Sequence, residues 1–172
     1  MGSNVGVGEV DVKLAKAGWE SAFRDHHADL VRLATFLTGD HHAADEVVAT
    51  VFVRTHDKLV GVADVRAFLR RAVVNGVRDA HRRRVVRIRP MPGAQGSTDP
   101  VIEGALIGDQ QRRVWRVVQG LPTRQRECVV LRFYEDLTEA SIAEILGISR
   151  TAVNTNLDRA RRRLAAELEG ER

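Results

Sequence analysis

The segment from residue 138 to residue 163 constrains the fold most, because its pattern requires two helices that cross closely around a tight turn. Ala143 is small where two steeply crossing helices nearly touch, and Gly147 stands where the turn needs a positive φ. The spacing of Ala143, Gly147 and Val153 predicts a helix-turn-helix. The plainer interpretation is a helical hairpin in which the glycine only ends a helix. The other apolar positions fill the space between the helices: Ile142, Leu146, Ile148 and Leu157.

The second helix of this motif has a polar outer face. Ser149 can cap its N-terminus. Side chains of this kind can contact phosphates and base edges in a major groove. The candidate DNA-contacting residues are Arg150, Thr151, Asn154, Thr155, Asp158, Arg159 and Arg162.

Arginine clusters point to a polyanionic partner. The net charge is only +4, but the isoelectric point is near 10.0. One cluster comprises Arg82, Arg83, Arg84, Arg87 and Arg89, and the other Arg159, Arg161, Arg162 and Arg163. Such clusters favour binding to nucleic acid. The alternative is that the arginines reflect genomic base composition and form solvated faces.

Helical periodicity organises the rest of the chain, and no strand pattern interrupts it. The first helix ends at residues 38–40, and Asp40 and Asp64 can cap the second and third helices. A segment rich in proline and glycine follows the third helix, and helical periodicity then resumes. The prediction is an all-α protein of two small helical domains joined by a flexible linker. Its parts are a flexible tail (1–18), a helical bundle (19–89), the linker (90–104) and the helix-turn-helix domain (105–172).

The sequence lacks the residues that several other classes of function usually require. Cys128 is the single cysteine, which leaves no internal disulfide or cysteine-based zinc site, and its apolar neighbours predict a core position. The pairs His26–His27 and His41–His42 lack the spacing that places two metal ligands on one helical face. No phosphate-cradling loop or nucleophile elbow is present. We therefore expect no catalysis, no cofactor and no metal.

The sequence also predicts where the protein resides. No apolar stretch approaches the roughly 20 residues that cross a bilayer, and the N-terminus lacks the order of a signal peptide. We expect a cytoplasmic protein without membrane insertion.

The C-terminal half resembles the sigma-4 domain of extracytoplasmic-function (ECF) sigma factors, a group of the sigma-70 family of RNA polymerase subunits. The resemblance lies in residues 121–127, 130–134 and 137–149. It implies that the second helix, residues 150–163, reads the −35 promoter element with the residues named above. It also implies that another surface of this domain meets the flap of core polymerase.

The N-terminal half resembles the sigma-2 domain of the same group, most closely the SigE-like actinobacterial kind. The similar segments include residues 30–34, 37–40, 43–48, 52–54 and 67–75. The resemblance implies that the second helix binds a coiled coil of the polymerase clamp through Asp45, Glu46, Val48, Phe52 and Arg54. It implies that the third helix and its preceding loop engage the −10 element through Val62, Ala63, Asp64, Arg71, Asn75, Arg78, Arg82 and Arg83. An anti-sigma factor is a further expected partner.

Two positions depart from the family pattern. Ala49-Thr50-Val51 precedes Phe52, where a polar pair is usual, and Asn154-Thr155-Asn156 follows Val153, where a basic residue is common. Asparagine can pair with two major-groove atoms of adenine, so the second departure predicts an unusual promoter preference.

Two other interpretations remain open. A stand-alone helix-turn-helix regulator would bind a palindromic site without polymerase. A sigma-like adaptor would bind polymerase or an inhibitor without starting transcription, and the change at Ala49 and Thr50 motivates that hypothesis.

Overall fold

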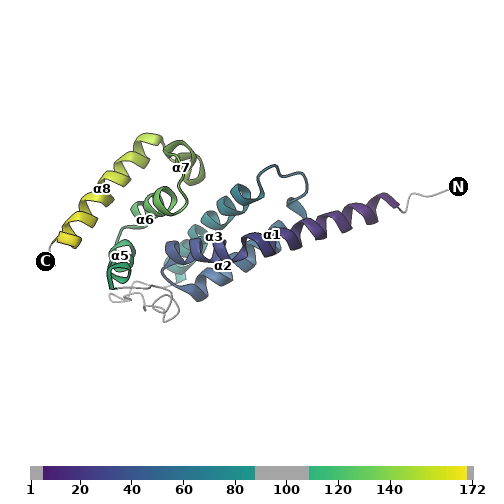
Figure 1. The fold of residues 1–172 in the computed structure, drawn as a ribbon, viewed down its shortest axis with the longest axis horizontal. Helices are drawn as coiled ribbons and strands as arrows, with labels where there is room; N and C mark the ends of the chain where they lie inside the picture. The colour runs from purple at the N-terminus through teal and green to yellow at the C-terminus, as the bar shows by residue number, and fades with distance from the viewer. Residues whose placement is uncertain (1–5, 88–108, 170–172) are drawn as a thin grey trace. The chain divides into compact units, whose positions relative to one another are not determined.

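The computed structural model describes residues 6–87 and 109–169, and the side chains of 17–83 and 112–167. Every regular element in these ranges is helical, which confirms the all-α prediction (Figure 1). The first part contains α1 (Gly6–Thr38), α2 (His41–Thr55), the short 3₁₀ helix η1 (His56–Lys58) and α3 (Val65–Arg87). The second part contains α5 (Asp109–Gln119), α6 (Thr123–Val129), the π-helical turn η2 (Val130–Tyr134), α7 (Glu139–Leu146) and α8 (Arg150–Glu169).

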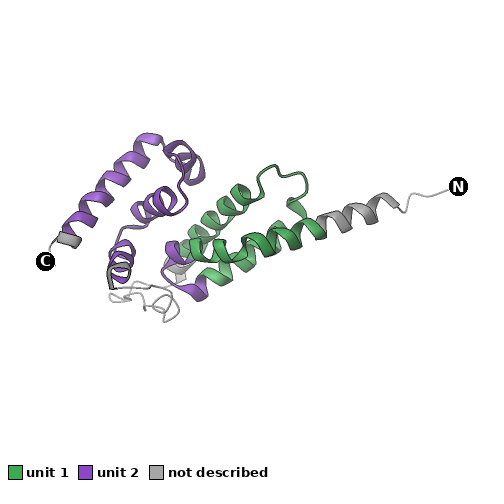
Figure 2. Cartoon of the chain, in the orientation of Figure 1, with its two compact units in different colours: residues 1–34, 44–89 green, residues 35–43, 90–172 purple. Residues whose placement is uncertain are grey.

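The chain forms two compact units, shown in different colours in Figure 2. Unit 1 comprises residues 1–34 and 44–89, and unit 2 comprises residues 35–43 and 90–172. The end of α1 and the start of α2 thus group with unit 2, although we expected residues 19–89 to form one domain. The expected linker, 90–104, lies outside the described residues.

Helix α1 begins earlier than the sequence pattern predicts. Residues 6–18, which we assigned to a tail, are helical in the structure. No proline occurs in this segment, and Leu14, Ala15, Lys16 and Ala17 are strong helix formers. Their propensity offsets the glycines, which cost about 1 kcal/mol each in a helix interior.

The core of unit 1 is built from the apolar stripes of its helices. Leu33, Val48, Phe52, Leu69 and Val73 are each at most 1% exposed. The two predicted N-caps are present: Asp40 Oδ1 accepts a hydrogen bond from the Ala43 amide at 3.1 Å, and Asp64 Oδ1 accepts one from the Ala67 amide at 2.8 Å. These caps fix where α2 and α3 start.

Unit 2 packs α6 and α7 against α8. Ile142, Leu146, Val153 and Leu157 are buried, as the motif predicts, whereas Ile148 of the same predicted set is half-buried. Cys128 is fully buried, in agreement with its predicted core position. Burial, together with the nearby Glu127 carboxylate, raises the pKa of the Cys128 thiol to about 11.

Candidate nucleic-acid interface

The turn between α7 and α8 holds α8 in a defined orientation. Gly147 has φ +63°, and the Ile148 amide donates to the Ala143 carbonyl at 3.1 Å. This is the pattern that closes a helix with a left-handed residue. Ser149 Oγ then accepts from the Ala152 amide at 3.1 Å and caps α8. The turn and the cap have the form predicted from the sequence, and they set the direction in which the outer face of α8 points.

The outer face of α8 carries all of the residues predicted to contact the −35 element. Val153, Leu157 and Ala160 form the buried face of the helix. The predicted residues are exposed on the opposite side: Arg150, Thr151, Asn154, Thr155, Asp158, Arg159 and Arg162. The helix therefore offers a polar surface with three arginines and one aspartate.

Some polar groups on α8 already have partners. Thr155 Oγ1 donates to the Thr151 carbonyl at 2.9 Å, and Asn156 Nδ2 donates to the Ala152 carbonyl at 2.8 Å. Asp158 Oδ1 accepts from Arg161 Nη1 at 3.3 Å. Within the described part of the chain, the side-chain amide of Asn154 makes no hydrogen bond. Of the asparagines that depart from the family pattern, Asn154 thus has its full pairing capacity available, and Asn156 does not.

The second cationic surface lies on α3. Arg71, Asn75, Arg82 and Arg83 are exposed, and Arg78 is half-buried. Arg82 forms an ion pair with Asp79 one turn earlier. The backbone of Arg84 and Arg87 continues the helix, while Arg89 lies outside the described residues.

The loop before α3 contains the other residues predicted to meet the −10 element. Val62 is half-buried, and Ala63 and Asp64 are exposed. The Asp64 carboxylate is engaged as the cap of α3, so its established part in the fold is to set where this helix begins.

A groove between α2 and α3 brings together residues from both predicted sets. This cavity, of about 250 Å³, is lined by Glu46 and Arg54 from α2 and by Asn75 and Arg83 from α3. The helices approach closely at Gly76, where an added Cβ would lie 3.0 Å from Val47 Cγ1. Sequence periodicity did not show this groove because it depends on how the two helices pack.

The structure corrects two of the residues predicted to bind polymerase. Val48 is 0% exposed and Phe52 is 1% exposed, so neither offers surface to a partner in the folded chain. The Phe52 carbonyl accepts a hydrogen bond from Trp19 Nε1 at 3.0 Å, which ties α2 to α1. Both side chains belong to the core of unit 1. Their family-like positions hold α2 in place instead of contacting a partner directly.

Sequence reasoning missed the exposed apolar residue on α2. Val53 is 75% exposed, on the same helix as Glu46 and Arg54, which are also exposed. The sequence does contain a sign of this surface, because Val53 follows Glu46 by seven residues and the two therefore lie on one side of a helix. Thr50, at the departure from the family pattern, is exposed and donates its hydroxyl to the Glu46 carbonyl at 2.8 Å.

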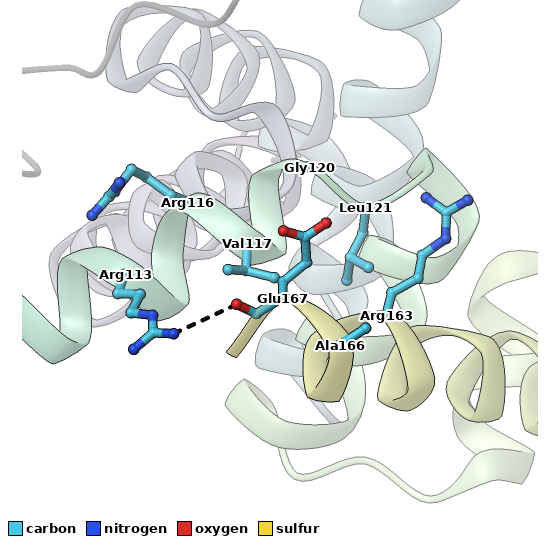
Figure 3. A pocket seen from close by; sticks show the side chains of 8 residues that line it. All are labelled: Arg113, Arg116, Val117, Gly120, Leu121, Arg163, Ala166 and Glu167. Carbon is cyan, nitrogen blue, oxygen red and sulfur yellow. Dashed lines mark hydrogen bonds between the residues drawn. The ribbon is translucent and has the colours of Figure 1, made fainter. Parts of the chain in front are cut away.

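Unit 2 contains a second groove, between α5 and α8, with a volume of about 330 Å³ (Figure 3). Val117, Leu121 and Ala166 form its apolar part. Arg113 donates from Nη2 to the Glu167 carbonyl at 3.5 Å and links the two helices. Arg116, Arg163 and the acidic side chain of Glu167 also line the groove, so charges of both signs border its apolar part (Figure 3). Such a surface suits a protein segment that carries both apolar and charged residues.

The described residues contain no group of three or more side chains suited to hold a metal ion. A search of the helices in the same ranges finds none with the length and apolar character needed to cross a membrane.

Comparison with known proteins agrees with this architecture. Residues 22–86 match the family model of sigma-70 region 2, and residues 111–164 match that of sigma-70 region 4. The chain is 33% identical over 159 residues to the RNA polymerase sigma-E factor of Streptomyces avermitilis, covering 88% of this chain and 85% of that one. It is 29% identical over 150 residues to the ECF sigma factor SigM of Mycobacterium tuberculosis, covering 86% and 75%.

Solved structures show the same fold. The sigma factor RpoE from Bartonella quintana, in complex with the anti-sigma factor NepR, superposes with a TM-score of 0.67 at 19% identity, covering 89% of this chain and 98% of that one. The ECF sigma factor SigJ of Mycobacterium tuberculosis superposes with a TM-score of 0.62 at 24% identity, covering 87% and 56%. With two regions matched in order and a sigma-E relative aligned over most of both chains, this chain belongs to the extracytoplasmic-function group of the sigma-70 family, and it is an alternative RNA polymerase sigma factor that initiates transcription.

Proposed function

We propose that the outer face of α8 binds the −35 element in the major groove, and this face is the observation that carries the proposal. Its arginines can contact phosphates, and its arginine, asparagine and aspartate side chains can also contact base edges, the two kinds of contact that DNA recognition requires. The capped turn at Gly147 and Ser149 presents the helix as a rigid unit.

We also propose that α3 and the loop before it bind the −10 element. Arg82 and Arg83 are exposed near the end of α3, where guanidinium groups can neutralise DNA phosphates. Arg71 and Asn75 are exposed earlier on the same helix, and half-buried Arg78 follows Asn75. Val62 and Ala63 precede the cap and form the loop proposed to hold an unstacked base.

The exposed face of α2 is proposed to bind the clamp coiled coil of core polymerase. Asp45 and Glu46 provide negative charge, Arg54 provides positive charge and Val53 provides apolar area. Mixed surfaces of this kind are usual at protein interfaces. The groove between α5 and α8 is the proposed contact of unit 2 with the polymerase flap, because its apolar part and charged border suit a protein segment.

Residues 19–89 and 105–172 are the proposed functional domains, with 90–104 as the linker that makes binding bivalent. An anti-sigma factor is a proposed partner, since the sigma factor RpoE was solved with one. We further propose that the chain acts in the cytoplasm, where polymerase meets DNA, and that it catalyses no reaction itself.

Run-off transcription tests the proposal. Purified chain added to sigma-free core polymerase should start discrete transcripts on genomic promoter fragments. The double substitution Asn154→Ala and Arg159→Ala should sharply weaken dependence on the −35 element while binding to core enzyme persists. Exposed Arg24, on α1 and outside the proposed DNA-binding faces, gives the control substitution Arg24→Ala, which should leave both activities unchanged.

The outcome also separates the sigma factor from the stand-alone regulator. A stand-alone regulator would bind a palindromic duplex with the same affinity whether or not polymerase is present. If the double variant keeps the promoter preference of the wild type, α8 is not the reading helix.

A further inference from the structure

One row of side chains on α8 combines three different polar groups that keep hydrogen-bonding capacity for a ligand. Arg150, Asn154 and Asp158 are spaced four residues apart, so they lie along one side of the helix. All three are exposed. In the part of the chain that the structure describes, Arg150 and Asn154 make no side-chain hydrogen bond, and Asp158 uses only Oδ1, toward Arg161. Each residue therefore keeps hydrogen-bonding groups for a ligand.

The three side chains match three different bases. An arginine can donate two hydrogen bonds to the O6 and N7 atoms of guanine. An asparagine can accept from N6 and donate to N7 of adenine, and an aspartate can accept from N4 of cytosine. No two of these three residues prefer the same base, so together they can encode a sequence and not only attach to the backbone.

The neighbouring positions support this division. The Thr155 hydroxyl and the Asn156 side-chain amide donate to backbone carbonyls one turn earlier, which occupies the Thr155 donor and one of the two Asn156 donors. Arg159 is exposed but lies off the row, and exposed Arg162 continues the row one turn beyond Asp158; both can reach phosphates.

We propose that Arg150, Asn154 and Asp158 read, in that order along α8, a G·C pair through guanine, an A·T pair through adenine and a second G·C pair through cytosine. This inference rests on the proposed binding of α8 to the −35 element. Successive members of the row are about 6 Å apart along the helix axis, since each residue adds about 1.5 Å. Base pairs are stacked about 3.4 Å apart, so the three pairs fall within roughly five base pairs.

Selection from a randomised promoter tests the code. The base pairs of the −35 element, in a promoter found by run-off transcription, are randomised, and sequences that support initiation by the complete holoenzyme are counted. Wild-type protein should enrich guanine, adenine and cytosine at three separate pairs. Asn154→Ala should lose about tenfold of the discrimination at the A·T pair and leave the other two unchanged.

The substitution Asp158→Asn should create a new base preference, which a misfolded protein could not do. Asparagine pairs with adenine, so the preferred base at the third pair should change from cytosine to adenine. Arg161→Ala is the matched control: it removes the ion-pair partner of Asp158 and should leave every preferred base unchanged.

The possible failures are distinguishable. If wild-type holoenzyme shows no preference at any upstream pair, the proposed −35 function is wrong. If it shows a preference that Asn154→Ala and Asp158→Asn do not change, or that Asp158→Asn changes toward a base other than adenine, the −35 function stands and the code is wrong.

Discussion

Arg124 Nη1 donates to Glu127 Oε2 at 2.8 Å, and the carboxylate that it meets is only 4% exposed. Arg161 and Asp158 have the same spacing of three residues on α8, but both of their side chains are 59% exposed. The carboxylate of the first pair is buried and both groups of the second are exposed, so a comparison of the two pairs bears on the effect of burial.

We expect Arg124→Ala to lower the free energy of unfolding by about 1–3 kcal/mol, because it leaves a buried carboxylate with fewer partners. Arg161→Ala should cost less than about 1 kcal/mol, as exposed pairs do. Urea denaturation of both variants measures the difference. Equal losses would contradict the claim that burial of Glu127 makes its pair the more important one.

Gly147 permits a second matched comparison, because its backbone requires a conformation that other residues avoid. An added Cβ would meet no atom within 4 Å, so steric contact does not restrict the site, but its φ is +63°. Gly147→Ala should therefore lower the free energy of unfolding by about 1–2 kcal/mol through backbone strain alone. Gly147→Asn should cost less, since asparagine tolerates this region.

Gly18 is the control for this substitution. It lies within α1, and an added Cβ there also meets nothing within 4 Å. Gly18→Ala should raise the free energy of unfolding by about 0.5–1 kcal/mol, because alanine favours the helix. Thermal melting of the two alanine variants should show shifts of opposite sign. A shift in the same direction would mean that the φ of Gly147 does not decide the result.

Cys128 predicts a pH dependence of stability. Burial, with Glu127 adding to it, raises the thiol pKa from 9.0 to about 11. Below pH 9 the thiol is protonated in both the folded and the unfolded chain. Between pH 9 and 11 the unfolded chain ionises while the folded chain does not, so the free energy of unfolding falls as pH rises.

Cys128→Ala removes this contribution and leaves the other titrating groups in place. The difference in unfolding free energy between wild type and variant should shrink by an amount on the order of 2 kcal/mol from pH 8.5 to pH 11. Denaturant titrations at several pH values measure it. A difference that stays constant with pH would show that the thiol ionises equally well in the folded state.

The sequence predicted those parts of the fold that local chemistry controls. Asp40, Asp64 and Ser149 cap helices where expected, since a short polar side chain before an apolar periodic run satisfies free amides. Gly147 adopts the predicted positive φ. The start of α1 was placed too late, because glycines near a chain end suggest a tail although neighbouring residues favour a helix.

The candidate site was less predictable, because exposure depends on packing between helices. Val48 and Phe52 resemble family contact positions, but both side chains are buried, and the Phe52 ring packs against Trp19 and Phe23 of α1. The back-bond from Asn156 to Ala152 gives adjacent asparagine positions on α8 different roles, and the sequence pattern alone does not distinguish them. The groove between α2 and α3 likewise follows from the close approach at Gly76.

The difference between Val53 and Phe52 yields a direct test of the polymerase-binding face. Val53 is 75% exposed, so Val53→Glu should leave the melting temperature nearly unchanged while it places a charge in the proposed apolar contact and weakens binding to core polymerase at least tenfold. Phe52→Ala should instead lower the free energy of unfolding by about 3–5 kcal/mol.

Val60→Glu, at another exposed apolar residue outside α2, is the control and should retain core binding. Fluorescence anisotropy with core enzyme, together with thermal melts, separates these effects. If Val53→Glu binds core enzyme as well as wild type does, the clamp contact does not involve this side of α2, and Glu46 and Arg54 lose their proposed role with it.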